Sequence, residues 1–357
     1  MTAEPDRMEP GAGRDVPSDV GDDPGAGPPT TGRGARLGSL IGLVLGGAAL
    51  VLVLRTLGRE WEQAEHHLRN ARPGWLLLAV ILAAAGMSSI GLVWGRVLDQ
   101  LGVAVGAARV VAWYFVGELG KYLPGGVWPV VGRGELARRG GVPRSRAYTS
   151  VALSLGMLYL AALFTVAALI PFALSEGGYS PWMLFLLALP IGVVVLHHDV
   201  LERIVSVVRR LTGRVVHLDV PRWRQSLTLV AAYLPTWAFI GVSTWAVARA
   251  LTPEAPFVRV VFAAVLSWVA GFLAVPVPAG AGIREAVLLA TSGLGGGVAV
   301  ATAIVARLIF VGVDCLGAFV GLPVATRRRG GVRVGPMPGS IDHREGGPVP
   351  GDEPSGR

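Results

Sequence analysis

Charged side chains within apolar sequence are the groups of this chain that could do chemistry. The stretch 116–135 reads VGELGKYLPGGVWPVVGRGE and places Glu118, Lys121, Arg133 and Glu135 among apolar residues. Lys121 is the only lysine in the chain. Because a lysine ammonium group is a compact point charge that binds phosphate, this stretch is a candidate site for an anionic group.

A second stretch repeats the same combination of residue types. Residues 275–286 read VPVPAGAGIREA and place Arg284 and Glu285 directly after proline and small residues. Further on, Arg307 and Asp314 interrupt another apolar segment. Seven residues apart, they lie on nearly one face of a helix, about 10 Å apart along its axis. Each of these charges needs a partner inside a membrane, so we include them in the candidate site.

Helix-breaking residues lie beside both charged stretches. They are Pro124, Gly125 and Gly126 in the first stretch and Pro278, Gly280 and Gly282 in the second. At bilayer depth such breaks are tolerated only where the backbone is buried in protein or lines a wet cavity. Two breaks in the two halves of a hydrophobic chain indicate a transporter-like site at which two broken segments meet.

The charges allow a structural and a functional interpretation. Glu118 and Lys121 are three residues apart, so they share a helix face and could form an internal ion pair. Alternatively, Lys121 binds an anionic phosphate while nearby half-helix N-termini supply N–H donors. These two roles can coexist. The candidate cations Lys121, Arg133, Arg284 and Arg307 are matched by Glu118, Glu135, Glu285 and Asp314, so this balanced set suits a zwitterionic headgroup as well as an anion.

Composition predicts an integral membrane protein. Of the 357 residues, 52% are hydrophobic and only 16% are charged. The formal net charge of +8 comes from arginines spread over short loops between apolar segments, which is typical of a multi-pass membrane protein and not of a nucleic-acid-binding module. The single cysteine, Cys315, lies in an apolar segment and is expected to be buried. His197-His198-Asp199 is the best local metal-ligand cluster, and its spacing is poor for one site, so no metal or cofactor is expected.

The chain is predicted to be an all-α polytopic membrane protein with about six full spans and two re-entrant helical hairpins, eight hydrophobic segments in all. The expected spans are 37–54, 74–95, 147–174, 180–196, 225–248 and 286–325, and the expected hairpins are 110–139 and the segment from 260 through the second break. The domain is thus 37–325, and the tails 1–36 and 326–357 are expected to be disordered.

Arginine placement predicts the topology. With the N-terminus in the cytoplasm and both broken segments re-entrant, the arginine-rich loops 138–146 and 203–224 lie inside, as the positive-inside rule requires. The first hairpin then enters from the cytoplasm and the second from outside, which is the arrangement of inverted-topology repeats. An alternative topology places the N-terminus outside and makes the first broken segment span.

The motifs GKYLPGGVW, RGE and PAGAGIREA resemble the transmembrane flippase-like domain of lysylphosphatidylglycerol synthases and its stand-alone relatives. The resemblance covers roughly residues 37–325 and implies a protein that moves or handles a phospholipid or polyprenyl-linked lipid. The matching positions are Glu118, Lys121, Pro124, Gly125 and Arg133 in the first break, and Pro278, Gly280, Gly282, Arg284 and Glu285 in the second. Full-length synthases also carry a soluble aminoacyl-transferase domain, and this chain shows none, so synthase activity is not expected.

Three functions therefore remain in competition. The first is a lipid flippase-like transporter of the cell membrane whose hairpins guide a polar headgroup. The second is a non-transporting membrane partner of a separately encoded lipid-modifying transferase. The third is a membrane enzyme acting on a lipid-linked substrate, which ranks last because no nucleophile, base and orienting group occur together. The expected partners are membrane lipids, with no nucleic acid, and the sequence does not indicate an oligomeric state.

Overall fold

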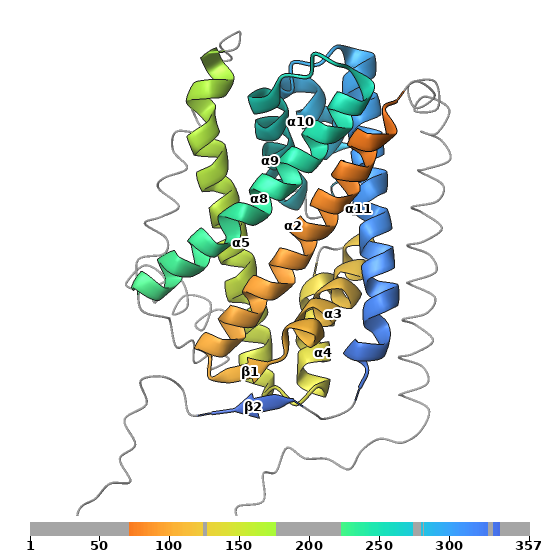
Figure 1. Cartoon of the computed structure of the whole chain (residues 1–357). Helices are drawn as coiled ribbons and strands as arrows, with labels where there is room; N and C mark the ends of the chain where they lie inside the picture. The colour runs from red at the N-terminus through yellow and green to blue at the C-terminus, as the bar shows by residue number, and fades with distance from the viewer. Residues whose placement is uncertain are drawn as a thin grey trace, which may run out of the picture. The chain divides into compact units, whose positions relative to one another are not determined.

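The computed structural model describes residues 71–123, 127–175, 223–273, 280, 282–327 and 331–335. All of them belong to one compact unit. The elements in chain order are α2 (Pro73–Gln100), β1 (Val103–Val105), α3 (Ala107–Glu118), the 3-10 turn η1 (Leu119–Tyr122), α4 (Trp128–Arg139), α5 (Arg144–Ser175), α8 (Trp223–Leu251), α9 (Phe257–Leu273), α10 (Ile283–Thr291), α11 (Gly296–Ala325) and β2 (Val332–Val334) (Figure 1).

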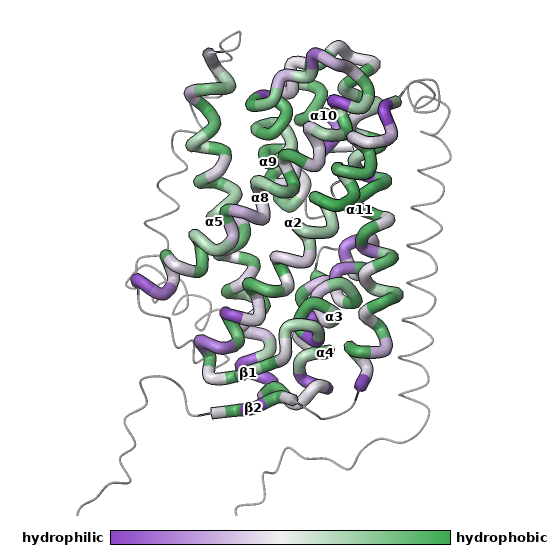
Figure 2. Tube along the Cα trace, in the orientation of Figure 1, coloured by the Kyte–Doolittle hydropathy of each residue, from purple (hydrophilic) through white to green (hydrophobic). Residues whose placement is uncertain are grey.

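Four of the described helices, α2, α5, α8 and α11, are long and apolar enough to cross a membrane. Each contains 28 or 30 residues of such sequence, and about 20 residues suffice for a bilayer. Their hydrophilic residues lie mostly toward the helix ends, with a second group beside α3 and another near α10 (Figure 2). The predicted spans 74–95, 147–174 and 225–248 correspond to α2, α5 and α8.

Other predicted segments are absent from the described part or have different bounds. The expected spans 37–54 and 180–196, the arginine-rich loop 203–224 and the tail 1–36 lie outside the described residues. The expected span 286–325 is wrong as one segment, because the chain turns between α10 and α11. Gly293 adopts a φ of 72° in that turn, a left-handed conformation that glycine adopts at little cost.

Two pairs of short helices lie between the long ones. α3 and α4 contain 12 residues each and pack against each other, joined through η1. α9 and α10 contain 17 and 9 residues and form the second pair. In Figure 1 the α3–α4 pair lies beside the lower part of α11, toward the end with the two strands, whereas the α9–α10 pair lies toward the opposite end. The predicted broken segments are therefore helix pairs, and their insertion into a membrane from opposite sides stays a prediction.

Glycines allow the close approach within each pair. A Cβ atom added at Gly132 would lie 3.2 Å from the Cα atom of Gly117 across the first pair. A Cβ atom at Gly280 would lie 2.5 Å from the Cα atom of Gly271 across the second pair. The backbone that approaches Gly280 therefore belongs to its own pair and not to the other predicted hairpin.

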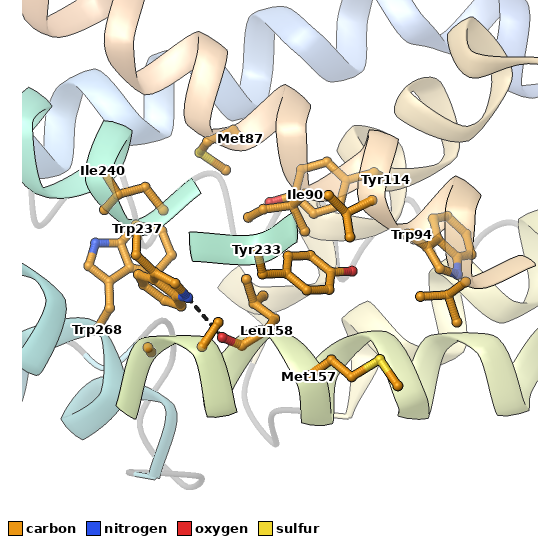
Figure 3. Close-up of a cluster of buried hydrophobic side chains, with 14 of the residues drawn as sticks. Met87, Ile90, Trp94, Tyr114, Met157, Leu158, Tyr233, Trp237, Ile240 and Trp268 are labelled. Atoms are coloured by element: carbon orange, nitrogen blue, oxygen red, sulfur yellow. Dashed lines mark hydrogen bonds between the residues drawn. The ribbon is translucent and has the colours of Figure 1, made fainter. Parts of the chain in front are cut away.

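Buried aromatic residues hold the long helices together (Figure 3). Trp237 of α8 donates its indole N–H to the backbone oxygen of Leu158 on α5 at 2.8 Å. Trp94 of α2 donates to the hydroxyl oxygen of Ser150 on α5 at 3.0 Å. Because a buried indole N–H needs an acceptor, these bonds fix the contact points of α5 against α2 and α8.

A short antiparallel sheet lies at one end of the bundle, where Val103 of β1 pairs with Val334 of β2. Arg146 at the start of α5 donates to the backbone oxygen of Gly335 at 3.0 Å, which ties the second strand to the bundle. Residues 331–335 belong to the tail expected to be disordered, so that expectation does not hold for this strand. Its pairing partner lies more than 200 residues away in the chain, where no local pattern could indicate it.

Candidate functional site

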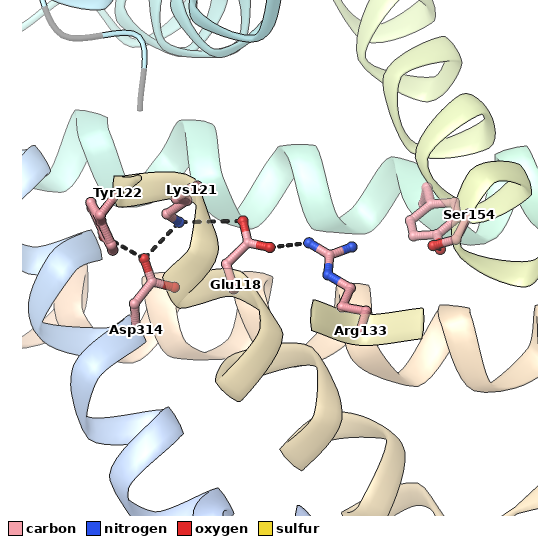
Figure 4. A network of polar contacts seen from close by, with 7 residues as sticks. Glu118, Lys121, Tyr122, Arg133, Ser154 and Asp314 are labelled. Carbon is pink, nitrogen blue, oxygen red and sulfur yellow. Dashed lines mark hydrogen bonds and ion pairs between the residues drawn. The ribbon is translucent and has the colours of Figure 1, made fainter. Parts of the chain in front are cut away.

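The first helix pair carries a chain of ion pairs that reaches α11 (Figure 4). Arg133 of α4 pairs with Glu118 at the end of α3. The Nζ atom of Lys121 on η1 lies 3.4 Å from the Oε1 atom of Glu118 and 2.6 Å from the Oδ2 atom of Asp314 on α11. The predicted Glu118–Lys121 contact is thus present, and Asp314, distant in sequence, is the closer partner of the lysine.

These charges are withdrawn from solvent. Asp314 is 0% exposed, Arg133 3% and Glu118 8%. Taking ions out of water costs several kcal/mol per ion unless each is paired and hydrogen-bonded. Tyr122 supplies one further bond by donating its hydroxyl to the Oδ2 atom of Asp314 at 2.7 Å. The chain of ion pairs therefore fixes η1 against α11.

The second helix pair carries a separate ion pair. The Nη1 atom of Arg307 on α11 lies 2.7 Å from the Oε1 atom of Glu285 on α10. The other carboxylate oxygen of Glu285 accepts the backbone N–H of Gly282 at 2.6 Å. Glu285 therefore caps the first turn of α10 and joins that helix to α11.

Arg284 differs from its neighbours because no carboxylate pairs with it among the described residues. Its guanidinium group lies 3.8 Å from the centre of the Trp268 ring of α9, in a cation–π contact. Gly271 provides the space for this side chain, since a Cβ atom there would lie 2.5 Å from the Cγ atom of Arg284. The guanidinium N–H groups are donors held in a fixed fork that matches a phosphate or a carboxylate.

The same indole brings the two helix pairs together. The Nζ atom of Lys121 lies 5.6 Å from the centre of the Trp268 ring. Lys121 and Arg284, one cation from each predicted break, are therefore less than about 10 Å apart. Trp268 is not among the site residues predicted from the sequence. A signal was present, because this tryptophan lies deep within an apolar segment, whereas interfacial tryptophans lie at segment ends.

A small cavity lies where these residues converge. Its walls include Lys121 and Tyr122 from the first pair, Trp268, Arg284 and Glu285 from the second pair, and Arg307 from α11. Its volume is about 40 Å³, which is enough for a few water molecules. Of the residues predicted for the site, the structure thus places Lys121, Arg284, Glu285 and Arg307 around one cavity, with Asp314, Glu118 and Arg133 in a row behind Lys121.

Glu135 does not belong to this group. It lies near the end of α4, where Arg138 binds it at 2.7 Å and Arg139 at 2.8 Å. Hydrogen bonds from these two arginines lower the pKa of Glu135 to about 2. The balance of four cations and four carboxylates inferred from the sequence is therefore wrong for the cluster. Four cations face three carboxylates there, and Arg284 is the cation without a carboxylate in the described part.

The remaining predicted site residues are the helix breakers. Pro124, Gly125, Gly126 and Pro278 lie outside the described residues. Gly280 and Gly282 have φ angles of 65° and 82°, in the left-handed region that favours glycine. They turn the chain into α10 directly before Arg284.

Two further expectations concern Cys315 and metal binding. Cys315 was expected to be buried, but its side chain is exposed on the outer face of α11, next to the buried Asp314. No group of three histidine, cysteine, aspartate or glutamate side chains arranged to hold a metal ion occurs within the described ranges.

Long apolar helices enclose charges that are carried by two pairs of shorter helices and by α11. This arrangement defines a polytopic membrane protein with an internal polar site. The chain belongs to the family described as the lysylphosphatidylglycerol synthase TM region, whose family model matches residues 39–317. This match includes both helix pairs and every charged residue of the cavity. No protein in a collection of curated proteins matches the chain.

Proposed function

We propose that the protein translocates lipids across the membrane by passing the polar headgroup between its two helix pairs. The observation that carries the proposal is the position of Lys121 and Arg284, one from each pair, at the same indole of Trp268. In this proposal the lipid tails remain in the bilayer and the headgroup phosphate is held by these two cations. Membership of a family of lipid-synthase membrane regions supports a lipid as the substrate.

The charge of the cluster favours an anionic headgroup. With Glu135 held outside by Arg138 and Arg139, the remaining cluster of buried and half-buried charges has one more cation than carboxylates among the described residues. An unpaired guanidinium in a low-dielectric site is costly, and a phosphodiester would neutralise it through two parallel hydrogen bonds. A headgroup with net charge −1 balances the cluster, whereas a zwitterion leaves the excess in place.

The size of the cavity supports a mechanism in which the two pairs move apart. A volume of about 40 Å³ holds a few waters and is too small for a glycerophosphate headgroup. The described conformation is therefore closed to the headgroup. Loading requires the α9–α10 pair to separate from η1, which exposes Lys121 and Arg284 to one side of the membrane at a time.

Reconstituted protein tests this proposal. Phosphatidylcholine vesicles would carry a trace of fluorescent phosphatidylglycerol, a phosphodiester anion, and the dye in the outer leaflet would be bleached by dithionite. We expect the wild type to expose inner-leaflet dye quickly and Arg284→Gln to approach the protein-free rate. Arg139→Gln is the matched control, because this arginine is 72% exposed and outside the cavity. Fluorescent phosphatidylcholine should move more slowly than phosphatidylglycerol.

The other outcomes separate the competing functions. Mass spectrometry of the same vesicles would reveal a covalently altered lipid if the protein is an enzyme. Absence of both lipid movement and lipid alteration would contradict the proposal and support a non-transporting partner of a transferase. Equal rates for wild type and Arg284→Gln, both above the protein-free rate, would support translocation and would contradict a role for the shared site of Lys121 and Arg284 in it.

A further inference from the structure

We propose that Asp314 is a proton-binding site, and that one proton binds there whenever the phosphate of an anionic lipid binds to Lys121. This inference rests on the proposed function, because it requires the phosphate to occupy the site between Lys121 and Arg284. The proton comes from water and bonds to a carboxylate oxygen of Asp314, and no other covalent bond forms or breaks.

The geometry around Asp314 makes its charge depend on a single lysine. Asp314 is fully buried, and its Oδ2 atom receives both Lys121, at 2.6 Å, and the hydroxyl of Tyr122, at 2.7 Å. Its Oδ1 atom has no hydrogen-bond partner in the described part of the chain. Lys121 is the only cation that forms an ion pair with Asp314 within that part.

Glu118, the other carboxylate that contacts Lys121, does not share this dependence. It keeps Arg133 as a second cationic partner when Lys121 turns away. Without a ligand, the two positive charges of Lys121 and Arg133 equal the two negative charges of Glu118 and Asp314. A phosphate held between Arg284 and Lys121 is matched in charge by Arg284, but it draws Lys121 away from Asp314, which is then left with only a neutral phenol as donor.

A buried carboxylate without a cation, close to a second negative charge, is unstable as an anion and binds a proton instead. The proton fits the free Oδ1 atom, because Tyr122 can continue to donate to Oδ2 in the neutral acid. Phosphate binding and protonation thus support each other. By thermodynamic linkage, the affinity for the phosphate must then rise as the pH falls.

The ionisable groups around Asp314 come from η1, α3, α10 and α11 itself. η1 contributes Lys121 and Tyr122, α3 contributes Glu118 and Tyr114, α10 contributes Arg284 and Glu285, and α11 itself contributes Arg307 and Cys315. α2 and α8 have their charged residues near their ends, Arg96 and Asp99 in the former and Arg224 and Arg249 in the latter. Of all these groups, only Lys121 and Tyr122 bond to Asp314.

The test measures the Kd of dihexanoylphosphatidylglycerol for the purified full chain in a neutral detergent from pH 5 to 8. This probe is suitable because a phosphodiester keeps its single negative charge throughout that range. For the wild type we expect the Kd to increase by up to tenfold per pH unit. Tail-free glycerophosphoglycerol shares the phosphodiester and serves as a second arm, which separates a lipid site from a site for soluble phosphodiesters.

Asp314→Asn should bind the probe with a Kd that does not change with pH, because the amide imitates the protonated acid. Glu135→Gln is the matched control and should keep the pH dependence of the wild type. If Asp314→Asn does not fold, the wild type still decides. Calorimetric titrations in buffers of different ionisation enthalpy count the protons taken up, and we expect up to one per bound lipid.

The outcomes distinguish this inference from the proposed function. Binding of the probe with a constant Kd and without proton uptake overturns the proton site and leaves the phosphate site standing. A pH dependence that persists in Asp314→Asn also overturns it and assigns the proton to another group. Failure to bind either phosphodiester at any pH contradicts the proposed function and this inference together.

Discussion

The Nζ atom of Lys121 lies 2.6 Å from Asp314 and 3.4 Å from Glu118, so the lysine's nearer carboxylate is supplied by the last long helix and not by its own turn. The two acids also differ in what else they bind. Glu118 has Arg133 as a second cation, and Asp314 has only the hydroxyl of Tyr122. Loss of the lysine should therefore destabilise the ionised form of Asp314 far more than that of Glu118.

This difference predicts the result of a rescue experiment on stability. Lys121→Met should destabilise the protein by about 3–5 kcal/mol, because it leaves an unpaired buried charge. Adding Asp314→Asn should recover most of the lost stability. Adding Glu118→Gln should recover little, since it leaves Arg133 without its carboxylate partner. Denaturation midpoints of the purified protein in detergent would measure the three variants. Equal rescue by both second substitutions would contradict the assigned pairing.

Arg284 and Arg307 should respond differently to the same substitution. Arg307→Gln removes the partner of Glu285 at the start of α10 and should cost about 1–3 kcal/mol of stability. Arg284→Gln breaks no ion pair in the described structure and removes an unpaired charge, so it should leave the unfolding midpoint unchanged or raise it while it weakens phosphodiester binding. A large loss of stability in Arg284→Gln would indicate a structural role and would remove the argument for an anion there.

Two neighbouring glycines provide a matched test of packing within the second helix pair. Gly280 and Gly282 both have positive φ angles, of 65° and 82°, but a Cβ atom would meet Gly271 at the first and open space at the second. Both alanine variants should show about 1 kcal/mol of backbone strain. Only Gly280→Ala should lose several kcal/mol more and abolish lipid movement. Similar stabilities for the two variants would show that close packing of α9 against the turn is not required.

The orientation of the two helix pairs can be tested by labelling single cysteines in a Cys315→Ser background. Arg139 is the last residue of α4, Glu254 lies in the turn before α9, and both are exposed. An impermeant maleimide should modify Glu254→Cys in intact cells, and Arg139→Cys only after the membrane is opened. Both labels appearing on one side would contradict the insertion of the pairs from opposite sides.

The sequence predicted the elements whose signals are local. Apolar length marked α2, α5 and α8, and proline with glycine marked the interrupted segments that follow α2 and α8. The break between α10 and α11 also had a local signal, since the residues from Ser292 to Gly297 are S-G-L-G-G-G. The apolar sequence on both sides masked that signal, because hydropathy averaged over a span-length window hides a short turn.

The ion-pair partner of a charged residue was predictable only where the pairing depends on spacing along one helix. Glu118 and Lys121 are three residues apart and do meet, as a shared helix face requires. The Lys121–Asp314 contact depends on how α11 packs against η1, and no pattern within either segment specifies that packing. For the same reason the sequence assigned Glu135 to the site, although arginines on its own helix bind it at the surface.

Both helix pairs are attached to the long helices at their outer ends. Trp113 of α3 donates to the backbone oxygen of Ala325 at 3.3 Å, and Val332 of β2 lies close to Gly141 in the turn that follows α4. The first pair is thus anchored to the terminal turn of α11 and to the sheet. The second pair has a matching bond, because Trp245 of α8 donates to the backbone oxygen of Ala255, just before α9, at 3.2 Å. If the two pairs separate as proposed, each would therefore turn about an outer end that stays attached to the bundle, and β2, although far from the charges, would help to keep Lys121 in place.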